Sequence, residues 1–156
     1  MEITLNKNIE DLVRLRGRID DRLERLKRKL TVMFTDLRAY TEYVSRYGDT
    51  AGLAKLQRQN DLLFPIIGSH RGVVAKTIGD AIMAFFEQPG EAVAAAVEMQ
   101  RALEQHNRSQ SEQEKIQVRI GLNEGIGIVR EDNDVYGDVV NVAARIQSLA
   151  QPEQIL

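Results

Sequence analysis

The sequence predicts an α+β fold in which an antiparallel sheet carries helices on one face. Three observations favour it. Strand-like apolar segments alternate with helix-like ones along the chain, and tight turns join neighbouring strand-like segments. Hydrophobic residues make up 43% of 156 residues, which is the length and the composition of an ordinary globular domain.

Residues 1–29 are predicted to form an amphipathic signalling or dimerisation helix. Leucine and isoleucine recur at spacings of three and four over about three heptads, with Arg16 at one position of this seam. The apolar seam consists of Ile9, Leu12, Ile19, Leu23, Leu26 and Leu30. A helix so rich in charge has one face to bury. Two arrangements remain open: the helix docks on its own domain, or it pairs with a second copy in a parallel coiled coil.

The segment from Leu30 to Thr35 is apolar and β-prone, so we expect a buried strand that Asp36 closes. Residues 37–47 are predicted to form a short helix, and residues 49–70 a longer one that Pro65 bends. Two strands follow, separated only by Gly79-Asp80, which predicts a tight hairpin.

The second half of the chain continues to alternate between helices and strands. Its predicted elements are the hairpin strands at 72–78 and 81–87, an alanine-rich helix at 91–106, a polar loop at 107–115, a second strand pair at 117–123 and 126–129 around Glu124-Gly125, an acidic loop at 131–137 and a final helix at 138–149. The order of the elements from residue 30 onward matches the βαββαβ arrangement of ferredoxin-like folds.

The composition excludes several functions. The chain has no Cys, which rules out disulfides, a thiol nucleophile and a sulfur-based zinc site. Residues 31–156 carry 12 Lys/Arg and 17 Asp/Glu, so we expect no nucleic-acid partner. The longest apolar runs have six residues, so we expect no membrane segment, and no export signal is recognised.

Asp36 and Asp80 stand out by position, one at the end of the first strand and the other in the hairpin turn. In a βαββ unit the first strand commonly lies beside the hairpin, so the two carboxylates could converge. Carboxylates beside a helix N-terminus would suit Mg²⁺ and a triphosphate. The alternative is that both are ordinary turn and capping acids.

The final helix carries a second candidate pair. Asn141 and Arg145 are four residues apart, so they lie on one helix face and suit a polar, anionic ligand. The alternative is a solvent-facing polar stripe. Lys76 in the hairpin is likewise either a ligand-binding residue or an ordinary surface lysine.

Four segments together resemble the class III nucleotidyl cyclase catalytic domain over about residues 30–156, in both order and spacing. They are FTDLRAYT at 34–41, KTIGDA at 76–81, RIGLN at 119–123 and DVYGDVVNVAAR at 134–145. One departure is Ala39, which stands where this family usually has glycine.

The resemblance implies a role for each candidate residue. Asp36, Asp80 and the backbone carbonyl of Leu37 would bind two Mg²⁺ or Mn²⁺ ions per site. Lys76 and Asp134 would read the purine, and both are of the adenine-reading type, which favours ATP over GTP. Asn141 would position the ribose, and Arg145 would stabilise charge on the α-phosphate. The backbone N–H groups that would cradle phosphate belong to Leu37, Arg38, Ala39, Tyr40 and Thr41.

The resemblance thus implies an adenylate cyclase, which converts ATP to 3′,5′-cyclic AMP and pyrophosphate in signal transduction. The metal acids would act from one subunit of a homodimer and the other residues from its partner, under the control of an upstream sensor domain. The alternative is a non-catalytic cyclase-like module that dimerises and passes signals. ATP as substrate and the lack of Cys predict a cytoplasmic location.

The family's domain continues through further strands after the segment that matches residues 154–156, and one of them usually supplies a lysine for the triphosphate. No residue of this sequence is assigned that role.

Overall fold

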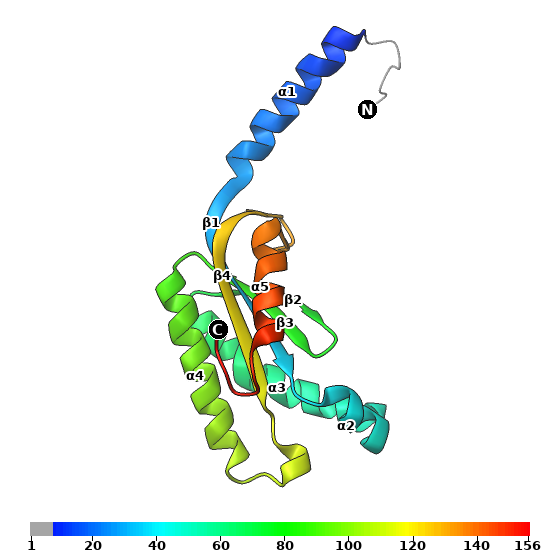
Figure 1. Ribbon diagram of the computed structural model, residues 1–156, viewed down its shortest axis with the longest axis vertical. Helices are drawn as coiled ribbons and strands as arrows, with labels where there is room; N and C mark the ends of the chain where they lie inside the picture. Colours follow the sequence, from blue (N-terminus) through cyan, green and yellow to red (C-terminus); the bar gives the residue numbers. More distant parts are fainter. Residues whose placement is uncertain (1–7) are drawn as a thin grey trace.

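The computed structural model describes residues 8–156, which fold into helices and strands, most of them labelled in Figure 1. In chain order they are α1 (Ile9–Leu26), β1 (Lys27–Leu37), α2 (Tyr40–Tyr47), α3 (Asp49–Ser69), β2 (Val73–Ile78), β3 (Ala81–Phe86), α4 (Pro89–Asn107), the 3₁₀ turn η1 (Glu112–Glu114), β4 (Val118–Val129), β5 (Val135–Tyr136) and α5 (Asp138–Leu149). The α3 helix runs without a break through Pro65.

The strands form one five-stranded sheet in the order β2-β3-β1-β4-β5, and every neighbouring pair is antiparallel. The central strand β1 pairs with β3 on one side and along its whole length with β4 on the other. This arrangement confirms the predicted α+β, ferredoxin-like fold, including the hairpin turn at Gly79-Asp80.

The predicted second strand pair is wrong, because β4 is one strand of 12 residues. Glu124 and Gly125, the expected turn, pair instead with Thr31 and Leu30 of β1. The physical reason is that β1 starts at Lys27 rather than at Leu30 and offers β4 a continuous partner.

Helices cover both faces of the sheet, which corrects the expectation that they share one. On one face Met33 and Phe86 pack with residues of α3 and α4, whereas on the other face Phe34 and Met83 pack with Val139 and Ala143 of α5. In Figure 1, α5 lies in front of the sheet and α3 behind it.

Glycines of β4 allow α5 to lie so close to the sheet. A Cβ atom at Gly121 would come within 2.3 Å of the backbone nitrogen of Gln147, and Gly125 and Gly127 also face Val139. A helix can therefore pack on this face only because these positions lack side chains.

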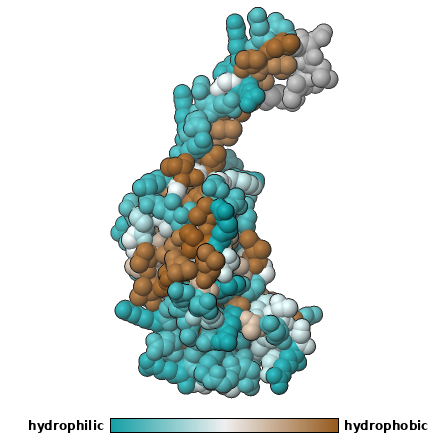
Figure 2. Space-filling model, in the orientation of Figure 1, coloured by the Kyte–Doolittle hydropathy of each residue, from teal (hydrophilic) through white to brown (hydrophobic). Residues whose placement is uncertain are grey.

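The N-terminal helix projects away from the sheet, as Figure 1 shows, and none of its described residues is buried. Ile9 is 80% exposed, Leu12 53% and Ile19 50%, so the alternative in which the helix docks on its own domain is wrong. The brown side chains along α1 in Figure 2 include this exposed seam.

The helix also ends earlier than predicted, since residues 27–29 pair with β4 as part of β1. Residues 1–7 of the predicted helical segment lie outside the described residues. Within residues 8–156 no helix combines the length and the apolarity that a bilayer-spanning segment requires.

Candidate active site

The two predicted metal acids interact with each other at one end of the sheet. Asp36 is the penultimate residue of β1, and Asp80 lies in the β2–β3 turn, which the β1–β3 pairing brings to the same end. Burial raises the pKa of the Asp80 carboxyl above its ordinary value, and the neighbouring carboxylate of Asp36 raises it further. The backbone N–H of Leu37 donates to Asp80 Oδ2 at 3.0 Å, and this hydrogen bond lowers the pKa of Asp80.

This pair fits a divalent cation in its chemistry, because two neighbouring carboxylates hold negative charge that a hard cation would neutralise. Among residues 8–156 no three acidic, histidine or cysteine side chains surround a common point. An ion would therefore need further oxygen ligands from the backbone, from water or from phosphate.

Arg119 is a third member of this cluster, and the motif at 119–123 that contains it did not predict this role. Its Nη2 and Nε atoms donate to Asp36 Oδ2 at 2.8 and 3.0 Å, and its Nη1 atom donates to the carbonyl of Ser148 at 3.1 Å. Arg119 is the register partner of Asp36 across β1 and β4. The contact between Arg119 and Asp36 follows from the register of β1 against β4, which the sequence alone did not specify.

The loop from β1 to α2 follows the acid pair. Ala39, the residue before α2, has φ 56° and ψ 28°, which is the left-handed conformation that glycine adopts more easily. The N–H groups of Leu37 and Arg38 already donate to Asp80 and to the carbonyl of Gln117, respectively. Because the first N–H groups of a helix have no acceptor within it, those at the start of α2 are the better part of the predicted phosphate cradle.

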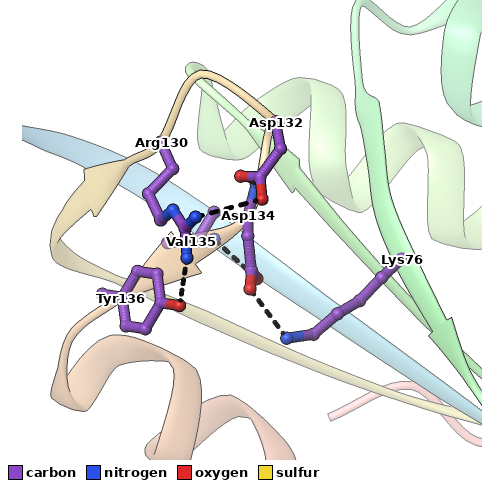
Figure 3. Close-up of polar contacts among 6 residues, drawn as sticks. All are labelled: Lys76, Arg130, Asp132, Asp134, Val135 and Tyr136. Carbon is purple, nitrogen blue, oxygen red and sulfur yellow. Dashed lines mark hydrogen bonds and ion pairs between the residues drawn. The ribbon is translucent and has the colours of Figure 1, made fainter.

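Lys76 and Asp134 form an ion pair, drawn in Figure 3, with 3.0 Å between Lys76 Nζ and Asp134 Oδ2. Lys76 is on edge strand β2 and Asp134 immediately precedes β5 at the other edge. The hydrogen bond from Lys76 lowers the pKa of the Asp134 carboxyl, and a bond from the backbone N–H of Val135 lowers it further.

The loop that carries Asp134 is braced by its own contacts. Arg130 donates to the hydroxyl of Tyr136 at 2.8 Å and lies 3.5 Å from a carboxylate oxygen of Asp132 (Figure 3). The backbone N–H of Arg130 donates to the carbonyl of Asp134 at 2.8 Å. These contacts hold the Asp134 carboxylate toward Lys76.

The third predicted pair lies on α5. Asn141 and Arg145 are exposed, whereas Val139, Ala143 and Gln147 form the buried face of the helix. The two polar residues therefore share the outer face, as their spacing predicted. No hydrogen bond or ion pair within residues 8–156 joins either of them to the two acids.

Comparison with known proteins places these residues in a family. The family described as "Adenylate and Guanylate cyclase catalytic domain" matches residues 24–156. The chain belongs to this family. The resemblance noted in the sequence is thereby confirmed for the cyclase domain.

Individual proteins of the same family are also similar to this cyclase domain. It is 33% identical to an adenylate cyclase of Anabaena cylindrica over 139 residues, which is 80% of this chain and 28% of that protein. Two other curated relatives are covered over 22% and 15% of their length, so the chain spans a minor part of the proteins it matches.

Solved structures of cyclases are also similar to this chain. The structure of an adenylate/guanylate cyclase/hydrolase from Silicibacter pomeroyi has a TM-score of 0.74 at 32% identity, over 83% of this chain and 74% of that one. The adenylyl cyclase CyaB from P. aeruginosa has a TM-score of 0.73 at 27% identity, over 83% and 76%.

Proposed function

We propose that this cyclase domain converts ATP to 3′,5′-cyclic AMP and pyrophosphate at a site shared by two copies of the chain. The observation that carries the proposal is the placement of Asp36 and Asp80, two partly buried carboxylates, at the same end of the sheet, where Asp36 raises the pKa of Asp80. Like charges held together in this way are typical of functional sites. The adenylate cyclases among the relatives support the choice of reaction.

Asp36, Asp80 and the backbone carbonyl of Leu37 would hold two Mg²⁺ or Mn²⁺ ions, which activate the ribose 3′-hydroxyl and neutralise the triphosphate. In the reaction the 3′-oxygen loses its proton and bonds to the α-phosphorus, and the bond from that phosphorus to the pyrophosphate oxygen breaks. The N–H groups at the start of α2 would bind phosphate oxygens as the charge moves.

Lys76 and Asp134 would select the base. The ammonium group can donate to the ring nitrogen N1 of adenine, and the carboxylate can accept from the exocyclic amine. Guanine presents a donor and an acceptor at the same two places, so both protein groups would lose their partners. The ion pair between them would open to admit adenine, because each group exchanges one partner for another.

Asn141 and Arg145 would act on the sugar and the α-phosphate. Both are exposed on α5, where a nucleotide held by a second copy can reach them. Arg145 would stabilise the charge that develops on the α-phosphate, and Asn141 would orient the ribose by hydrogen bonding. Their lack of polar contact with the acid pair of their own chain favours a site between two copies in a twofold arrangement.

The exposed seam of α1 would then join the two copies in a parallel coiled coil and connect them to an upstream sensor. Replacing Leu12 and Leu23 by glutamate tests this role without touching the sheet. We expect weaker dimerisation by analytical ultracentrifugation and lower activity. Unchanged dimerisation would remove the coiled coil from the proposal.

The experiment that tests the function is product identification. The protein is incubated with Mn²⁺ and either ATP or GTP, and the products are separated by chromatography, with Asp80→Asn as the inactive control. Cyclic AMP from ATP is the expected product. A preference for GTP would overturn the substrate, and a folded dimer without cyclic product would favour a non-catalytic signalling module.

A further inference from the structure

A cavity of about 340 Å³ lies between α2, α3 and the segment that leads from η1 into β4. It shares Arg38 and Ala39 with the β1–α2 loop, but neither Asp36 nor Asp80 lines it. Four basic and two acidic side chains line the cavity, which gives it an excess of two positive charges. They are Arg38, Arg46, Lys55, Lys115, Glu42 and Glu112.

Lys55 is the most unusual of these side chains, because the residue is only 4% exposed. Its ammonium group donates to the carbonyl of Gln113 at 2.8 Å and lies 4.2 Å from the centre of the Tyr43 ring. Burial lowers the pKa of Lys55, since taking a charge out of water is costly. A buried ammonium group with three donors and one carbonyl partner is well suited to an anion.

Two further cations of the cavity have no acidic partner among residues 8–156. Arg38 donates to the side chain of Gln117 at 3.0 Å, and Arg46 lies 5.5 Å from the centre of the Tyr47 ring. Within residues 8–156 neither of them, nor Lys55, lies within 4.0 Å of a carboxylate oxygen, whereas Lys115 pairs with Glu112.

Glu114, the acid outside the cavity whose charge acts on Lys55, is already engaged. Glu114 accepts from Arg58 at 2.6 Å and from the hydroxyl of Tyr43 at 2.7 Å. Its charge acts on Lys55 from a distance, and the charge of Arg58 opposes it. These contacts fix the Tyr43 ring against the Lys55 ammonium group. The wall of the cavity is thus held in place, and the positive charge of Lys55 has no carboxylate of the described residues in contact with it.

We propose that this cavity binds a compact phosphoryl anion, such as inorganic phosphate or pyrophosphate, at a site separate from the acid pair. Two or more negative charges on one small group match the excess positive charge, and guanidinium and ammonium groups are the usual partners of phosphate oxygens. Because Arg38 and Ala39 also belong to the loop after Asp36, a bound anion would steady the start of α2.

The test is a titration of the ¹⁵N-labelled full chain with sodium phosphate and, separately, with sodium pyrophosphate, followed by NMR. Divalent metal is absent, and sodium chloride at equal ionic strength is the reference. We expect saturable shifts centred on the amides of Arg46, Lys55 and Gln113. Equal shifts with chloride, or shifts confined to Asp36 and Asp80, would overturn the proposal.

Two variants sharpen the titration. Lys55→Met keeps the length of the side chain and removes a buried charge, so the variant should fold, and Arg46→Gln changes an exposed residue. We expect each to weaken anion binding about tenfold or more. Lys29→Met, at an exposed lysine that pairs with Glu124, is the matched control and should bind as the unmodified chain does. Unchanged affinity in Lys55→Met would contradict the proposal.

A third arm identifies the source of the phosphoryl group. A non-hydrolysable ATP analogue is titrated without metal. If the free anions shift the cavity amides and the analogue does not, the site takes a free anion, as proposed. If only the analogue shifts them, the site belongs to the phosphate tail of the nucleotide and the proposal of a separate anion site fails.

Discussion

Two pairs of charged side chains lie in the proposed site, and they differ in sign. Asp36 and Asp80 carry the same charge, and burial together with the neighbouring carboxylate of Asp36 raises the pKa of Asp80. Lys76 and Asp134 carry opposite charges, and the pKa of Asp134 is lowered. In the first pair Arg119 offsets the charge of Asp36 alone, whereas in the second pair each charge offsets the other.

The two pairs differ in the interactions that hold them in place. Arg119 and the N–H of Leu37 keep the two acids together against their repulsion. Lys76 and Asp134 attract each other directly, and the backbone contacts of Val135 and Arg130 with Asp134 add to that attraction. A chain gains no stability from keeping like charges together, so the acid pair is the stronger evidence of function.

The largest effect is expected from Asp80→Asn, which removes the like-charge contact. A raised carboxyl pKa in the folded state means that stability falls as pH rises from the unfolded value through the folded one. The neutral amide avoids this loss and can still accept from Leu37 N–H. We expect activity to fall by about a thousandfold, while the melting temperature at neutral pH stays equal or rises. A parallel loss of activity and stability would mean that the pair is structural.

A charge swap tests the second pair. Lys76→Glu combined with Asp134→Lys keeps an ion pair but exchanges donor and acceptor, so the site should now match guanine. We expect the ratio of kcat/KM for ATP to kcat/KM for GTP to fall by at least about 100-fold, with unfolding by urea unchanged. The single substitution Lys76→Glu is the control that loses both the pair and the selectivity. An unaltered ratio in the double variant would contradict base reading by these residues.

A smaller effect concerns the loop that follows the acid pair. Ala39 has φ 56°, and replacing it by glycine should relieve the strain of a Cβ atom in the left-handed region. We expect Ala39→Gly to raise the free energy of unfolding by about 1 kcal/mol in urea titrations. The matched control is Ala94→Gly on the exposed face of α4, which should lower it by about 1 kcal/mol. Destabilisation by both substitutions would contradict the assigned loop geometry.

The smallest effect tests a charged cluster outside the site. His70, at the end of α3, contacts Glu91 and Glu98 of α4 through its two ring nitrogens, and these bonds raise its pKa. The protonated ring therefore contributes stability that is fully present below about pH 6.5 and lost as pH rises through the higher folded-state pKa. We expect the difference in unfolding free energy between the unmodified chain and His70→Gln to shrink over that range. A difference independent of pH would show that the ring acts only by packing.

Local patterns in the sequence predicted much of the fold, because spacing and turn chemistry are local properties. Gly79-Asp80 marked the hairpin, and the start and end of α5 were correct. The error at Glu124-Gly125 has a non-local cause, since these residues form a strand only because β1 offers them partners. The position of α5 depended on glycines whose role becomes visible only when the helix is packed against them.

In the candidate site, too, local motifs were predictable from the sequence and contacts between distant segments were not. The motifs singled out Asp36, Asp80, Lys76 and Asp134, and the structure brings them together as two pairs. The motif at 119–123 contains Arg119 but did not predict its contact with Asp36, because that contact depends on strand register. They also gave no sign of Lys55, since a lysine in a helix is ordinary until its burial is known.

In the proposed dimer, one nucleotide is bound by the acids of one chain and by the α5 residues of another. This arrangement can be tested by mixing the Asp80→Asn chain with the Arg145→Ala chain and measuring cyclic AMP formation. Each variant alone should be nearly inactive. Random pairing makes half of the dimers mixed, each with one intact site of two, so the mixture should recover about a quarter of the unmodified activity. No recovery, with mixed dimers demonstrated, would contradict this arrangement.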